Sequence, residues 1–139
     1  MKIRKILKYT WFPILVLLAA AWFISPVTFM KGVKPEEVAY ITIFDGNTGD
    51  ESDFDDQADI ACILENLQST PVKRDGISVL EMGYRFRMTF VGINGEELGQ
   101  VIINSADTIR GDFFFYTAKE GGLCFDYLWN LMDEVHDYI

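Results

Sequence analysis

The feature that most constrains this sequence is an apolar run near its N-terminus. No charged residue occurs between Lys8 and Lys31, a stretch of 22 positions. A helix over residues 9–30 would be about 33 Å long at 1.5 Å per residue, close to the roughly 30 Å hydrocarbon core of a bilayer. The sequence therefore predicts a transmembrane helix or signal anchor over residues 9–30.

The charges that flank this run predict its orientation. The basic residues before it are Lys2, Arg4, Lys5 and Lys8. After it, Lys31 and Lys34 are followed at once by Glu36 and Glu37. The positive-inside bias then predicts a cytoplasmic basic stub over residues 1–8, a linker over 31–37 and an extracytoplasmic domain over 38–139 at the cell membrane.

A cleavable signal peptide is the alternative for the same run. Ala19 and Ala21 form an A-x-A cleavage site after a short apolar stretch. Cleavage there would secrete the domain and leave Trp22 at the mature N-terminus, with the apolar run continuing to Met30. Because that continuation is untypical of a mature N-terminus, we favour the uncleaved anchor.

The charge balance of the remaining chain excludes one class of function. From Lys31 onward there are 8 basic and 21 acidic residues, a net charge of −13. Such a surface repels phosphate backbones, so we expect no nucleic-acid binding and favour cations or a basic protein partner at the cell surface.

Residue patterns predict the elements of the domain. β-Branched and aromatic residues over 38–44 indicate a strand, and the turn sequence 45–49 follows it. Helical spacing predicts a helix from Ser52 or Asp53 to Leu67. Alternation over 84–91, the hairpin signal Asn94-Gly95 and apolar residues over 97–103 indicate two paired strands.

The last part of the chain predicts two more short strands, over 105–110 and 113–117, and then a helix that begins near Phe125. The order predicts an α+β fold: an antiparallel meander sheet of about four to five strands with two helices packed on one face.

An acidic stretch is the leading candidate for a cofactor site. Residues 45–59 contain seven carboxylates and no basic residue. Oxygen ligands at this density predict a Ca²⁺ site, and the ligand set that we expect is Asp45, Asn47, Asp50, Asp53 and Asp56. The spacing departs from an EF-hand loop, since Asp50 occupies the glycine position. The alternative is a solvated acidic face at the start of a helix, where carboxylates favour the helix dipole.

Arginines and aromatic residues give a second candidate surface. Arg85 and Arg87 are two residues apart in a predicted strand, which directs them to one face, and Arg110 lies on a neighbouring strand. Such a row can bind a carboxylate or phosphate, or can be the wet face of the sheet. Phe113 and Phe115 lie in a run of aromatics that predicts a partner surface if the sheet is open there.

Catalytic signals are weak. The only histidine is His136, close to the end of the last helix, and nothing in its spacing predicts a nucleophile beside it. Cys62 and Cys124 have no metal-binding or redox spacing, and we expect two small buried side chains or a disulfide in an oxidising compartment. We therefore predict no catalytic residues.

The sequence also resembles small extracytoplasmic proteins of Gram-positive bacteria that are membrane-anchored or lipid-linked. The resemblance rests on the turn sequence IFDGNTG at residues 43–49, the Gly83-Tyr84 strand start and the segment NSADTI at residues 104–109. It implies the same topology and carries no named activity.

These observations together predict a non-catalytic, membrane-anchored extracytoplasmic binding or sensing domain. A calcium-dependent cell-surface module that uses residues 45–59 is the first alternative, and a small enzyme is the second.

Overall fold

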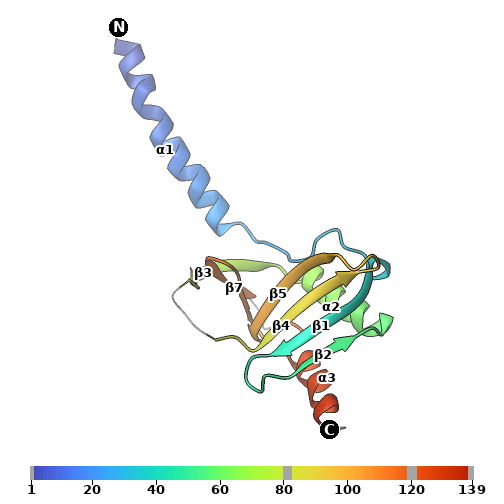
Figure 1. Ribbon diagram of the computed structural model, residues 1–139. Helices are drawn as coiled ribbons and strands as arrows, with labels where there is room; N and C mark the ends of the chain where they lie inside the picture. Colours follow the sequence, from blue (N-terminus) through green and yellow to red (C-terminus); the bar gives the residue numbers. More distant parts are fainter. Residues whose placement is uncertain (1, 80–82, 119–121, 138–139) are drawn as a thin grey trace.

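The computed structural model describes residues 2–79, 83–118 and 122–137. It consists of an N-terminal helix, α1 (Lys2–Ile24), and an α+β domain that follows it. Figure 1 shows α1 projecting away from the domain, while the C-terminus lies at the opposite end.

Seven strands form one antiparallel sheet. In chain order they are β1 (Val38–Asp45), β2 (Glu51–Phe54), β3 (Val72–Ile77), β4 (Phe86–Gly92), β5 (Glu97–Ser105), β6 (Thr108–Arg110) and β7 (Phe114–Ala118). Their order across the sheet is β2-β1-β4-β5-β6-β7-β3. The predicted α+β class is confirmed, and the sheet is larger than the four to five strands expected.

The two strands that sequence patterns missed are the two edges of the sheet. β2 is highly charged and occupies the span where we predicted the start of a helix, and β3 contains Lys73, Arg74 and Asp75. An edge strand pairs on one side only and need not alternate polar and apolar residues for burial. The period-2 signal is therefore absent from both.

Two helices cover one face of the sheet. Asp56 caps α2 (Gln57–Ser69) by accepting hydrogen bonds from the backbone N–H groups of Ala58 and Asp59. The second helix is α3 (Phe125–Asp137). Both contribute to a core whose fully buried members include Ile41 and Phe86 from the sheet. The helices contribute these buried side chains: Ile60, Ile63, Leu64, Leu67, Leu128 and Met132.

The structure does not support the predicted transmembrane helix over residues 9–30. The helix ends at Ile24, and the six residues that follow contact the domain because Val27 pairs with Val72. Phe29 packs edge-on against Tyr116. A one-turn 3₁₀ helix, η1 (Pro35–Glu37), then leads into β1. Within the part of the chain that the structure describes, no helix combines the length and hydropathy that crossing a membrane requires.

Candidate functional site

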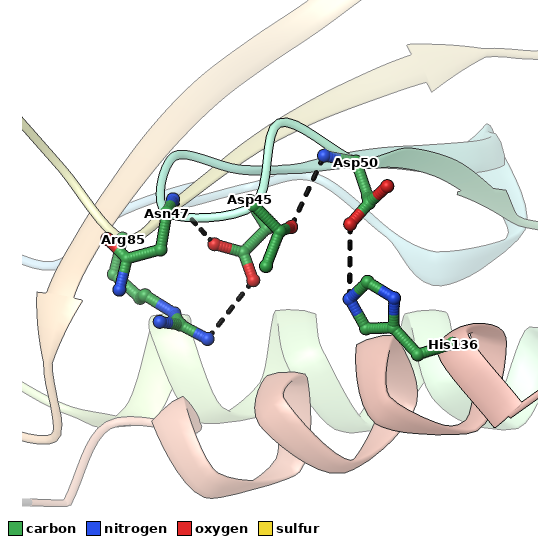
Figure 2. A network of polar contacts seen from close by, with 6 residues as sticks. Asp45, Asn47, Asp50, Arg85 and His136 are labelled. Atoms are coloured by element: carbon green, nitrogen blue, oxygen red, sulfur yellow. Dashed lines mark hydrogen bonds and ion pairs between the residues drawn. The ribbon is translucent and has the colours of Figure 1, made fainter.

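A polar network forms where the turn after β1 meets α3 (Figure 2). Asp45 is the last residue of β1, and its side chain is only 2% exposed. One carboxylate oxygen accepts a hydrogen bond from the backbone N–H of Asn47 at 2.8 Å. The backbone of Asp45 also bonds Asp50 and Gly49. Asp45 therefore holds the whole 45–50 turn together.

The charge of Asp45 is balanced by an arginine from the start of the neighbouring strand. Arg85 Nη2 lies 3.1 Å from Asp45 Oδ2, and the arginine side chain is 16% exposed. Its guanidinium stacks on the ring of Trp129 in α3, with Cζ 4.1 Å from the ring centroid. The backbone fits closely here, since a Cβ at Gly46 would collide with the carbonyl oxygen of Tyr84.

A second polar contact lies nearer to solvent. His136 Nε2 is 3.1 Å from Asp50 Oδ2, and the two side chains are 39% and 37% exposed. This contact joins the last turn of α3 to the same 45–50 turn, as Figure 2 shows. The network thus ties the turn to α3 at two points.

A small cavity of about 290 Å³ lies beside these contacts. Asp45, Arg85 and His136 line it together with Thr48 and with Trp129, Met132 and Asp133 of α3. The charges of Asp45 and Arg85 balance each other, whereas Asp133 adds a carboxylate to the lining. The contacts around the cavity position the 45–50 turn against α3.

The predicted calcium ligands do not converge. Asp45 is paired with Arg85, and Asp50 with His136. On β2, Asp53 accepts a hydrogen bond from Thr42 Oγ1 at 2.6 Å. The side chain of Asp56 caps the N-terminus of α2. No group of three or more His, Cys, Asp or Glu side chains within the described ranges could hold a metal ion. The structure therefore does not bring Asp45, Asn47, Asp50, Asp53 and Asp56 together, and most of these side chains make separate structural contacts.

The predicted arginine row is also not formed. Arg85 turns toward α3, whereas the guanidinium of Arg87 lies 4.9 Å from the ring centroid of Phe44 and 5.5 Å from that of Tyr84. Arg85 precedes β4, so the alternation of that strand does not govern its direction. Arg110 donates hydrogen bonds to the carbonyl oxygens of Gly83 and Ser78.

The two predicted aromatic surface residues differ in exposure. Phe113 is 68% exposed in the turn before β7, whereas Phe115 is half-buried. The turn also presents Asp112, and a cavity of about 360 Å³ beside it is lined by Trp22, Phe29 and Tyr116. Of the two aromatic residues predicted to form a partner surface, only Phe113 is therefore exposed.

The cysteines lie on neighbouring elements as free thiols. Cys62 is exposed on α2 and Cys124 is buried just before α3. Asn66, one turn beyond Cys62, accepts a hydrogen bond from the Cys124 backbone N–H at 2.9 Å. Burial raises the pKa of the Cys124 thiol to about 12. Nearby, Tyr127 donates a hydrogen bond to Asp59, which raises the pKa of the tyrosine.

Sequence patterns did not predict the contacts by which two arginines join separate elements. Arg85 links β1 to α3, and Arg74 links β3 to α1 by stacking on Trp22. Both contacts join residues at least 40 positions apart, so no local periodicity in the sequence predicts them.

Comparison with known proteins gave no relative: no protein-family model matches the chain, and no curated protein or solved structure shows significant similarity.

Proposed function

We propose that this protein is a membrane-attached, extracytoplasmic binding domain without catalytic activity of its own, and that α1 is its anchor. The observation that carries this proposal is the exposure of α1. From residue 8 to residue 24 every side chain is exposed, including those of Trp11, Leu17 and Ile24. A helix that is apolar on all sides needs an apolar environment, and the domain does not supply it.

The length of α1 favours insertion with both ends of the helix at the membrane–water interface. Its apolar part, residues 9–24, is about 24 Å long at 1.5 Å per residue, less than the roughly 30 Å hydrocarbon core. Lys8 can extend its ammonium group toward the headgroups, and Trp11 and Trp22 are of the type that favours the interface. Local bilayer thinning accommodates a short segment at modest cost.

The domain supplies a surface for a partner. Residues 45–59 carry seven carboxylates and no basic residue, and Figure 1 shows the β1–β2 turn at the end of the domain away from α1. Glu51, Asp53 and Asp55 are exposed there. A basic protein segment is the partner that this charge favours.

Labelling of Cys62 in intact cells tests the proposal. Cys62 is exposed, so a membrane-impermeant maleimide should label it from outside, and the full chain should stay with membranes through alkaline carbonate washing. Buried Cys124 should remain unlabelled, and the Cys62→Ser variant serves as the matched control.

Three results would contradict this proposal. Labelling of Cys62 only after cell lysis would place the domain inside the cytoplasm. Recovery of the chain in the aqueous fraction would exclude attachment, and a mature N-terminus at Trp22 would show that the segment is instead a cleaved signal peptide.

A further inference from the structure

The end of α1 is fixed to the sheet. The guanidinium of Arg74 in β3 lies 3.7 Å from the centroid of the Trp22 ring and donates a hydrogen bond to the Trp22 carbonyl oxygen at 2.8 Å. Phe114 of β7 makes edge-to-face contacts with both Trp22 and Phe23, with ring centroids 6.4 and 5.7 Å apart. The position of the helix end therefore determines the position of the β3–β7 edge.

Three exposed apolar side chains lie beside these contacts. Ile77, Val79 and Phe113 are 65%, 55% and 68% exposed, and we refer to them as the apical patch. Ile77 pairs with Phe114 in the sheet. The N–H of Ser78 donates to the carbonyl oxygen of Phe113 at 2.9 Å, which holds the patch together. The patch is thus continuous with the end of α1 through Phe114.

The charges near the apical patch differ from those at the far end. Lys73, Arg74 and Asp75 lie on β3, and Asp112 directly precedes Phe113 of the patch, so two cations and two carboxylates lie near it. The β1–β2 end, by contrast, is wholly acidic over residues 45–59. A surface of anionic lipid therefore repels the acidic β1–β2 end, whereas it does not repel the apical patch, where the nearby charges balance.

We infer that the apical patch is a second contact with the bilayer surface, and this inference rests on the proposed attachment of α1. If α1 is inserted as far as Ile24, Trp22 lies at the headgroup level, where tryptophan is favoured. Phe114, which contacts Trp22, and the patch beyond it must then lie at the same level. Aliphatic and aromatic side chains with nearby Arg and Lys are the composition that enters a lipid interface.

The occupant of the patch is therefore phospholipid. The domain sits on the bilayer through Ile77, Val79 and Phe113 in addition to α1, and its acidic β1–β2 end points away from the membrane. This arrangement presents the acidic surface to partners outside.

Depth-dependent fluorescence quenching tests the inference in the full chain. Phe113→Cys is made in a Cys62→Ser, Cys124→Ala background and labelled with an environment-sensitive fluorophore in vesicles of phosphatidylcholine and phosphatidylglycerol. Nitroxide carried on shallow lipid positions and iodide in the water serve as quenchers. The matched control carries the label at Glu134→Cys, an exposed position on α3. Val79→Cys provides a second patch site in case the Phe113 variant does not fold.

We expect the label at position 113 to be quenched several-fold more strongly by lipid nitroxide than the label at position 134, which iodide should quench instead. Strong iodide quenching at both sites, in chains that float with the vesicles, would overturn the inference and leave the attachment intact. Protection of position 113 from both quenchers would overturn it too, because a second copy or a protein partner would then cover the patch. Failure of the chain to float would refute the attachment itself.

Discussion

At the scale of single residues, Asp45 links the turn, the sheet and α3. It accepts a hydrogen bond from Asn47 and pairs with Arg85, and its carboxylate is almost completely buried. Removal of one member of a buried ion pair leaves the other charge without compensation, which costs far more than the loss of an exposed pair.

We predict that Asp45→Asn lowers the free energy of unfolding by about 3 kcal/mol, because Arg85 keeps its charge in a largely buried site. Asp53→Asn is the matched control. Asp53 is exposed and accepts one hydrogen bond from Thr42, so its replacement should cost less than about 1 kcal/mol. Urea unfolding of the full chain in mild detergent measures both, and equal losses would contradict the special role of Asp45.

A second prediction concerns Cys124 and pH. Burial raises the pKa of its thiol from 9.0 to about 12. Between these values the unfolded chain releases the proton and the native protein retains it. This contribution to stability is therefore complete below about pH 9 and is lost as the pH rises toward 12, with a slope of about 1.4 kcal/mol per pH unit for one proton.

The measurement is the free energy of unfolding at several pH values above about 8, for the wild type and for Cys124→Ala. The alanine variant should show a shallower decline, since it lacks the titrating thiol. Parallel curves for the wild type and Cys124→Ala would disprove the assignment.

At the scale of elements, the contact between α1 and the β3–β7 edge decides how the helix is oriented. Arg74 makes that contact by stacking on Trp22 and by a hydrogen bond to its carbonyl oxygen. The N–H of Val27 and that of Val72 each donate to the other's carbonyl oxygen at 2.8 Å, which adds a short antiparallel bridge. The segment that we predicted as a transmembrane end and a linker is therefore folded.

We predict that Arg74→Ala releases the helix end and increases proteolytic cleavage between Ile24 and Val27 several-fold, because that segment loses both the stacking contact and the hydrogen bond. Lys73→Ala, an exposed neighbour on the same strand, should leave the cleavage rate unchanged. The measurement is limited proteolysis of the full chain in detergent. An equal response of the two variants would show that Arg74 does not hold the helix.

The sequence predicted the central elements and missed those at the edges. Apolar alternation identified β1, β4 and β5, and helical spacing identified α2 and α3. One face of each of these elements is buried, which requires apolar residues at every second position in a strand and at every third or fourth position in a helix. β2 and β3 are edge strands with charged residues, so burial imposed no period on them. The start of α2 was placed too early, since Glu51 and Asp53 favour a helix start as readily as an exposed strand.

The candidate site was less predictable than the fold. The carboxylates of residues 45–59 suggest calcium by their density, yet Asp45, Asp50, Asp53 and Asp56 each bond a different partner. Two of these partners lie far away in sequence: Arg85 is 40 positions from Asp45, and His136 is 86 positions from Asp50. Only the packing of α3 against the turn reveals them.

At the scale of the whole molecule, charge is distributed along one axis, with the apolar helix at one end and the acidic turn at the other (Figure 1). A specific calcium site would bring several of these carboxylates to one point, and none is formed among the residues described. The domain is therefore expected to be insensitive to calcium.

We predict that millimolar calcium changes the melting temperature of the full chain no more than the same concentration of magnesium, with chelator as the baseline. Both ions screen the acidic surface equally. Thermal unfolding by circular dichroism measures the difference. A rise of several degrees with calcium alone would indicate a ligand bound only to the native state and would restore the calcium-dependent alternative.

The Val27–Val72 bridge also has a mechanical consequence. The covalent chain continues from Val27 through residues 28–37 into β1, so tension along α1 first pulls against the contacts that hold Val27 and Trp22 to β3. These few contacts should break at low load and release residues 25–30. Further force would then act on β1, which is paired on both sides in the sheet. The protein would thus yield in stages under tension, first at the bridge and only later in the sheet.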